Sequence, residues 1–337
     1  MKTTVSSATK NRVVWVLGSG FSRSIGGPLL NELMGQARWD RIKQIPEFVH
    51  RVPMWEKLLW YWNTYNGKPS AQWTDAEEFV EWIELMSTGA IPLDAQLANQ
   101  FPGQKPSFIA DACRKYLAAV TYEFTANAQP DFERWQPYRS FAALLQPQDH
   151  VMSFNYDQVL EKAFVAATGG EQIRVTLTSD KPGQLNKVHG SVDWTLGQDA
   201  QIIVQDPIFA IASPAEQVIG IPGPNKMSSC GTILQPQWQA SLAALREADI
   251  IVFMGYRFPP SDSYARHFIL DAIKNNSAAQ LTMRIVLGPQ RDEHVIRLEA
   301  LLNWAVRRRN DSAAVIHEPM WAQDFMAVFQ REYLAEH

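Results

Sequence analysis

The stretch that decides the fold is VVWVLGSGFSR, residues 13–23. Its first five residues are all apolar, and such a run predicts a buried strand. A turn rich in glycine and serine follows, and residues 29–38 predict a helix with Pro28 near its start. Glycines in this turn either let a ligand phosphate approach the backbone or serve the turn alone. Arg23 stands where the dehydrogenase fingerprint needs its third glycine, which argues against a hydride-transferring enzyme.

Strands and helices alternate again beyond residue 150. The expected strands are 151–154, 173–178, 187–188, 202–205, 250–254, 283–287 and 314–317, and the expected helices are 158–167, 236–248, 264–274, 292–306 and 322–334. Residues 213–231 are rich in Pro, Gly and Ser and predict a loop. Alternation of this kind is typical of a parallel sheet covered on both faces. The predicted fold class is therefore α/β, a doubly wound, Rossmann-like parallel sheet with a large helical insertion.

The block between residues 39 and 147 has the patterns of helices and no convincing strand. Helices are expected at 55–62, 107–124 and 137–145, and a capping box at 74–77 precedes an apolar stripe that includes Phe79 and Ile83. The carboxylates of this helix, which are Glu77, Glu78, Glu81 and Glu84, are expected on its solvated side. We therefore predict a sheet domain made of residues 1–38 and 148–337, interrupted by a helical insertion at 39–147.

Composition and charge exclude several classes of protein. The 337 residues are 46% apolar and 20% charged, which is typical of a globular chain. The net charge of −4 argues against broad, charge-driven binding of nucleic acid. The two cysteines, Cys113 and Cys230, cannot build a four-cysteine zinc site, and the sequence indicates neither a signal peptide nor a membrane span. We expect a soluble, cytoplasmic protein with no metal.

Polar residues follow several predicted strands, where ligands of parallel sheets bind. Asn155 and Asp157 follow the strand 151–154, and Asp157 either caps the next helix or faces the cleft with Asn155. His189 lies between a strand-like segment and a glycine, where it is either structural or an acid–base group. The stretch from Gly255 to Asp262 follows the strand 250–254 and is either a rigid Pro-Pro turn or a second site of close ligand approach.

The order of these motifs resembles the sirtuin-like family. The first loop carries Gly-x-Gly-x-Ser and ends in Gly-x-Pro at residues 26–28, and Asn-x-Asp, His-Gly and Gly-Tyr motifs follow at 155–157, 189–190 and 255–256. Sirtuin deacylases place an aromatic residue and an arginine after the proline and bind zinc with four cysteines, whereas this chain has two leucines there and two cysteines in all. It is more similar to the zinc-free branch found in bacterial anti-phage defence, although Arg257 replaces the usual serine.

The resemblance implies hydrolysis of NAD to nicotinamide and ADP-ribose, as an effector of abortive infection. It implies catalytic roles for Asn155 and His189, and binding of NAD by Gly18, Ser19, Gly20, Ser22, Arg23, Asp157, Gly255, Tyr256 and Arg257. Asp157 is expected to bind the nicotinamide carboxamide, and Ser22 and Arg23 the ribose or pyrophosphate. NAD is the expected substrate. Activity is expected to be gated by homo-oligomerisation or by a partner such as a co-encoded ATPase. The alternatives are an NAD or ADP-ribose sensor that cleaves nothing and, less favoured, an NAD-dependent deacylase.

Overall fold

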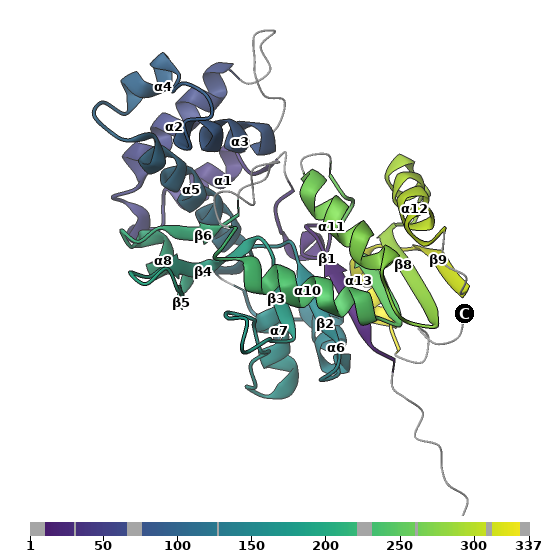
Figure 1. Ribbon diagram of the computed structural model, residues 1–337. Helices are drawn as coiled ribbons and strands as arrows, with labels where there is room; N and C mark the ends of the chain where they lie inside the picture. Colours follow the sequence, from purple (N-terminus) through teal and green to yellow (C-terminus); the bar gives the residue numbers. More distant parts are fainter. Residues whose placement is uncertain are drawn as a thin grey trace, which may run out of the picture.

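A six-stranded parallel sheet is the centre of the protein (Figure 1). The computed structural model describes residues 11–29, 32–65, 76–126, 128–220, 231–259, 262–307 and 312–330. In spatial order the strands are β3 (Leu185–Lys187), β2 (His150–Ser153), β1 (Val13–Leu17), β7 (Ile250–Met254), β8 (Gln280–Gly288) and β9 (Ser312–Pro319). Every neighbouring pair is parallel, so the protein is α/β and compatible with a Rossmann-like fold.

Strand β1 shows why its apolar run is continuous. Val14 and Val16 belong to one hydrophobic cluster, and Trp15 and Leu17 to another, because successive side chains of a strand point to opposite faces. The first cluster also takes in residues of α10 (Gln235–Glu247), α11 (Ser263–Lys274) and α12 (Glu293–Val306). The second takes in residues of α6 (Gln136–Leu144), α7 (Val159–Thr168) and α13 (Ala322–Val328). Both sides of β1 are therefore buried under helices, and an apolar residue is favoured at every position.

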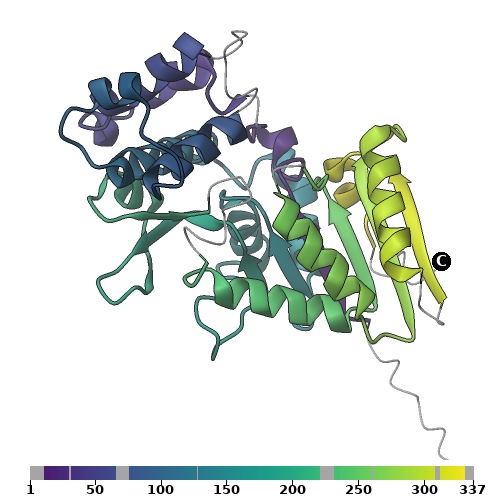
Figure 2. The same ribbon diagram turned by 45° about the horizontal axis from the view of Figure 1, so that its top comes forward.

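The helical block has a hydrophobic core of its own, built around one long central helix. Its helices are α1 (Gln36–Ile42), α2 (Val52–Tyr65), α3 (Ala76–Ser87), α4 (Ala95–Gln100) and α5 (Pro106–Ala126), with a 3-10 turn η3 (Pro46–Phe48). Apolar residues of α2, α3 and α5 form most of one cluster, in which Trp55 packs edge-on against Tyr116 and Phe48. Figure 2 shows this block beside the carboxyl edge of the sheet. The division of the chain at residues 39 and 147 stays a prediction.

A small antiparallel sheet lies against the helical block. Its strands are β5 (Ile202–Val204), β4 (Gly190–Leu196) and β6 (Gln217–Ile219) in spatial order, and α8 (Pro207–Ala212) packs beside them. Val192, Ile211 and Ile219 join the hydrophobic cluster of α5. The predicted loop at 213–231 was wrong in its first part, because β6 lies within it; residues 221–230 lie outside the described part of the chain.

Three other predictions need correction. The predicted helix 29–38 starts only at Gln36, because Gly35 is extended and the residues just before it form turns. The stretch 173–178 is not a strand but makes isolated bridges, one of which joins Val175 to Leu185. Glu84 is not solvated: it is buried and forms an ion pair with Arg114 of α5. The predicted capping box falls partly outside the described residues.

Further predictions agree with the structure. The expected helices at 55–62, 107–124, 137–145, 158–167, 236–248, 264–274 and 292–306 correspond to α2, α5, α6, α7, α10, α11 and α12 within a few residues, and α13 starts at the expected Ala322 but ends at Val328. In the described part of the chain, no helix combines the length and apolar character needed to cross a bilayer.

Two turns at the carboxyl edge contact each other backbone to backbone. Gly18 N–H donates to Met254 O at 3.1 Å, and Gly20 N–H donates to Gly255 O at 3.1 Å. Gly255 has a φ of +70°, and a Cβ on it would stand 2.6 Å from the Gly20 carbonyl carbon and 2.7 Å from its Cα. Only glycine fits there without moving the backbone of the first turn.

Replacing Gly255 by Ala should destabilise the protein much more than replacing Gly169 by Ala. Both glycines have a positive φ, +70° and +73°, but a Cβ on Gly169 meets nothing within 4 Å. Gly169→Ala should therefore cost only the backbone strain, about 1–2 kcal/mol. Gly255→Ala adds the steric clash, roughly 1–3 kcal/mol more. Urea unfolding of the two variants measures the difference, and equal losses would show that the two turns do not need their close contact.

Candidate functional site

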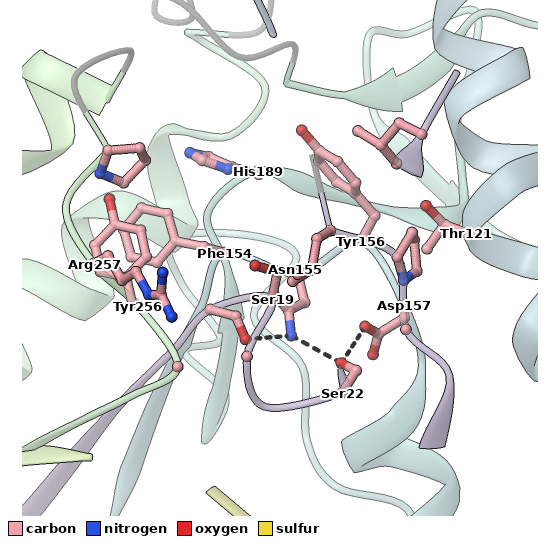
Figure 3. A pocket seen from close by; sticks show the side chains of 18 of the residues that line it. Ser19, Ser22, Thr121, Phe154, Asn155, Tyr156, Asp157, His189, Tyr256 and Arg257 are labelled. Carbon is pink, nitrogen blue, oxygen red and sulfur yellow. Dashed lines mark hydrogen bonds between the residues drawn. The ribbon is translucent and has the colours of Figure 1, made fainter. Parts of the chain in front are cut away.

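The turns that follow β1, β2 and β7, together with the β3–β4 connection, surround one cavity of about 410 Å³ (Figure 3). Its size is within the range of small-molecule sites, roughly 300–1,000 Å³. Of the predicted site residues, those that line it are Gly18, Ser19, Gly20, Ser22, Asn155, Asp157, His189, Gly255, Tyr256 and Arg257. The cavity lies at the carboxyl edge of the parallel sheet, between β1 and β7, where the order of the strands reverses. Sheets of this kind bind ligands at that point.

The glycines of the first turn are explained by the neighbouring turn. A Cβ on Gly18 would stand 2.5 Å from Gly255 O, and a Cβ on Gly20 would stand 2.7 Å from Gly255 Cα. The amides of Gly18, Gly20 and Phe21 all donate to carbonyls of the chain. These three amides are therefore committed to the fold, so they are not available to cradle a phosphate. Arg257 is the cationic side chain among the predicted NAD-binding residues that lines the cavity and can bind a phosphate.

Arg23 is not part of the cavity lining. It lies in the 3-10 turn η1 (Arg23–Ile25), and its guanidinium contacts Glu32 at 2.6 Å and the Gly27 carbonyl. Its side chain is about half exposed. Glu32 pairs with its charge in this structure, and the contact of Arg23 with ribose or pyrophosphate stays a prediction.

Asn155, Ser22 and Asp157 form a chain of hydrogen bonds on one wall of the cavity (Figure 3). Asn155 Nδ2 donates to Gly18 O at 3.0 Å and to Ser22 Oγ at 3.1 Å. Ser22 Oγ donates in turn to Asp157 Oδ2 at 2.6 Å. Since Nδ2 is engaged with the protein, the group that Asn155 can offer a ligand is its carbonyl oxygen, which is an acceptor.

Asp157 combines both of its expected positions. Its Oδ1 accepts from the backbone N–H of Val159 at 3.0 Å, which caps the start of α7, and its side chain also lines the cavity. Burial raises the pKa of Asp157 above its usual value of 3.8, although Lys187 and the hydrogen bond from Ser22 act in the opposite direction. Lys187 donates to the backbone carbonyl of Asp157 and to Glu161 Oε1, and its charge lowers the pKa of both carboxyls against the effect of burial.

His189 lines the same cavity as Asn155 (Figure 3), and the Asp262 carboxylate lies near it. Its Nε2 lies 4.0 Å from Asp262 Oδ1, and Tyr256 Oη donates to Asp262 Oδ2 at 3.0 Å. Phe154 stacks on Tyr256 with ring centroids 3.9 Å apart and meets His189 edge-on at 4.8 Å. These contacts hold the imidazole in an almost fully buried position beside the Asp262 carboxylate.

The loop that carries Tyr256 and Arg257 has an unusual backbone. Phe258 is fully buried and has a φ of +52°, a left-handed conformation that bulky residues rarely adopt. Its carbonyl accepts a hydrogen bond from Arg297 of α12. The hydrogen bond from Arg297 therefore holds the left-handed backbone of Phe258 from outside the loop.

Sequence reasoning missed several residues of the cavity. Asp262 belonged to the Gly-Tyr motif but received no role, because the sequence does not show that it lies beside His189. Trp321 follows β9 and lines the cavity with its ring against Gly288, and the rule about strand ends could have found it. The helical block adds Ala76, Val80, Leu117 and Thr121 from α3 and α5, for which the sequence held no signal.

No known protein-family model matches this chain, and no curated protein is similar enough to be named as a relative. The functional argument therefore rests on the residues of the cavity.

Replacing Asp157 by Asn should flatten the pH dependence of stability. The folded protein holds the Asp157 proton more tightly than the unfolded chain does, because burial raises the folded pKa. The stability from this proton is fully present below 3.8, the usual pKa of Asp, and is lost as the pH rises through the raised folded value. Urea unfolding between acidic and neutral pH measures the slope of the unfolding free energy.

Asp131→Asn is the matched control, since Asp131 is exposed and its replacement removes a carboxylate without touching the cavity. If Asp157→Asn and wild type show the same slope, the buried carboxyl of Asp157 does not bind its proton differently in the two states.

Proposed function

We propose that this protein is an NAD glycohydrolase with a doubly wound, sirtuin-like fold, which cleaves NAD to nicotinamide and ADP-ribose. The observation that carries the proposal is the meeting of Asn155 and His189 in one cavity at the β1–β7 switch point. Dinucleotides bind at this place in Rossmann-like sheets. The order of the motifs resembles that of the sirtuin-like family, and this resemblance also implies NAD as the substrate.

The proposed reaction breaks the bond between the nicotinamide nitrogen and C1′ of the ribose. Nicotinamide leaves with the bonding electron pair as a neutral base, so it needs no strong acid. Water adds to C1′ of the oxocarbenium-like ribose and loses one proton, which gives ADP-ribose. The main tasks of the protein are to orient the ribose and the water and to accept that proton.

The cavity supplies a group for each of these tasks. The carbonyl oxygen of Asn155, fixed by the bonds of its Nδ2, can accept a hydrogen bond from a ribose hydroxyl or from the water. His189 can accept the proton, and Asp262 then faces the resulting imidazolium at the distance of an ion pair. Arg257 can pair with the diphosphate. Asp157, held by Ser22 and Val159, can still face the carboxamide.

Asn155→Ala and His189→Gln should each reduce NAD turnover by about a hundredfold or more, because each removes a group that acts on the reacting atoms. The measurement is loss of NAD by the purified protein, with nicotinamide and ADP-ribose separated by chromatography. Asn275→Ala, at an exposed asparagine, is the matched control and should keep full activity.

Two outcomes would contradict this proposal. NAD binding without cleavage in wild type, with and without any co-encoded partner, favours a sensor of NAD or ADP-ribose. Release of acyl groups from an acylated peptide together with NAD consumption favours a deacylase. A role in abortive infection and gating by an ATPase stay predictions from the resemblance.

Trp321→Ala should raise the KM for NAD about tenfold and leave kcat nearly unchanged. The half-exposed indole of Trp321 lines the end of the cavity beyond β8, where the adenine of a bound NAD can stack on it. Stacking of a base on an aromatic ring contributes about 1–3 kcal/mol, and it is lost equally from the ground and transition states. Steady-state kinetics measure the effect.

Trp321→Phe keeps an aromatic ring and should keep most of the affinity. Nicotinamide mononucleotide lacks adenine, so its binding should not respond to either change. An unchanged KM for NAD in Trp321→Ala would place the adenine elsewhere.

A further inference from the structure

Helix α12 presents an apolar stripe on its outer face. Its inner face is buried against β8, β9 and α11, through Val295, Leu298, Leu302 and Ala305. On the outer face Ile296 is 52% exposed and Trp304 is 62% exposed, with the exposed Ala300 between them. Figure 1 shows α12 at the margin of the molecule, beside the edge strand β9. Two large apolar side chains on one surface line are unusual for a helix whose core face is already satisfied.

The stripe is symmetric in sequence about its centre. Counted from Ala300, Ile296 stands four residues before and Trp304 four residues after, and Glu293 and Arg307 stand seven before and seven after. All five residues are exposed. Steps of three, four, four and three residues follow one line along a helix. The line is about 21 Å long at 1.5 Å per residue.

We propose that this stripe is a self-complementary interface that pairs α12 with α12 of a second copy of the chain, antiparallel and centred on Ala300. In this arrangement Ile296 packs against the partner's Trp304, and Trp304 packs against the partner's Ile296. The small side chain of Ala300 lets the two helices approach closely at the two-fold axis. The contacts on either side of the axis each occur twice, as a two-fold interface requires.

Charge complementarity identifies the occupant as a second copy in antiparallel orientation. The stripe has an acidic end at Glu293 and a basic end at Arg307. Antiparallel pairing places Glu293 opposite the partner's Arg307 at both ends of the seam. Parallel pairing would place each charge opposite its own kind, which is unfavourable. One helix pair buries less surface than a typical stable interface, so we expect a weak dimer that depends on protein concentration.

This interface does not rest on the proposed function, but α12 connects it to the cavity. Arg297, on the same helix, donates to the carbonyl of Phe258 in the loop that carries Tyr256 and Arg257. The N-terminal cap of the helix, Asp292, also lies close enough to Arg257 to interact with its charge. Pairing of α12 therefore restrains the helix that holds this loop.

Sedimentation velocity over a range of concentrations tests the proposal with the full chain. Wild type should dimerise reversibly, and Trp304→Ala should weaken the dimer about tenfold or more, since it removes the main aromatic anchor. Phe209→Ala is the matched control: Phe209 is 63% exposed on α8, away from α12, and its loss should change nothing. Circular dichroism confirms that the variants are folded.

A charge exchange tests the orientation. Glu293→Arg alone and Arg307→Glu alone should each weaken the dimer about threefold to tenfold, because like charges then face each other at both ends. The double variant Glu293→Arg/Arg307→Glu should regain the wild-type affinity. Ala300→Cys, in a Cys230→Ser background, should form a disulfide between two copies under oxidising conditions, since the residue meets itself at the axis.

Several results would overturn the proposal. The first is a wild-type protein that sediments as a monomer at every concentration, and the second is an association that Trp304→Ala leaves unchanged. The third is a double charge variant that dimerises as weakly as the single variants. The fourth is the absence of a disulfide between two copies of Ala300→Cys. NAD turnover is measured separately, so an inactive dimer would refute the proposed function alone, and an active monomer would refute this interface alone.

Discussion

The contact between the turn after β1 and the turn after β7 is the constraint on which the site depends. Two backbone hydrogen bonds join the turns, and the three glycines involved leave no room for a Cβ between them. The three glycines line the cavity at the point where the order of the strands reverses. On one side of the contact, Asn155 donates a hydrogen bond to the Gly18 carbonyl. On the other side, Tyr256 donates to Asp262, which lies near His189.

The two walls of the cavity are held in different ways. On the wall of Asn155, hydrogen bonds continue through Ser22 to Asp157, and a buried lysine compensates the carboxylates below. On the wall of His189, aromatic rings fix the imidazole by their shape. A polar network fixes the direction of the Asn155 amide, whereas ring contacts fix the orientation of the His189 imidazole. The arrangement is preorganised before any ligand binds.

The sequence predicted what short-range patterns determine. Parallel strands covered on both faces are continuous apolar runs, so β1, β2 and β7 were found from their residues alone. The rule that ligands bind beyond strand ends led to Asn155 and His189. Long-range pairing was not visible: Glu84 was predicted to be a surface carboxylate, but it is buried beside Arg114. Strand β6 was missed because it lies in a stretch rich in Pro, Gly and Ser, where only the structure shows the Gln217 amide donating to three carbonyls of β4.

Phe258 has a left-handed backbone that costs of order 1–3 kcal/mol and persists only where the surroundings impose it. Its carbonyl is bound by a single arginine that belongs to a different helix. Loss of the arginine should therefore favour a glycine at 258, which relieves the strain, whereas a bulky residue at 258 is tolerated while the arginine is kept. Among homologues the two positions should vary together, although 39 residues separate them.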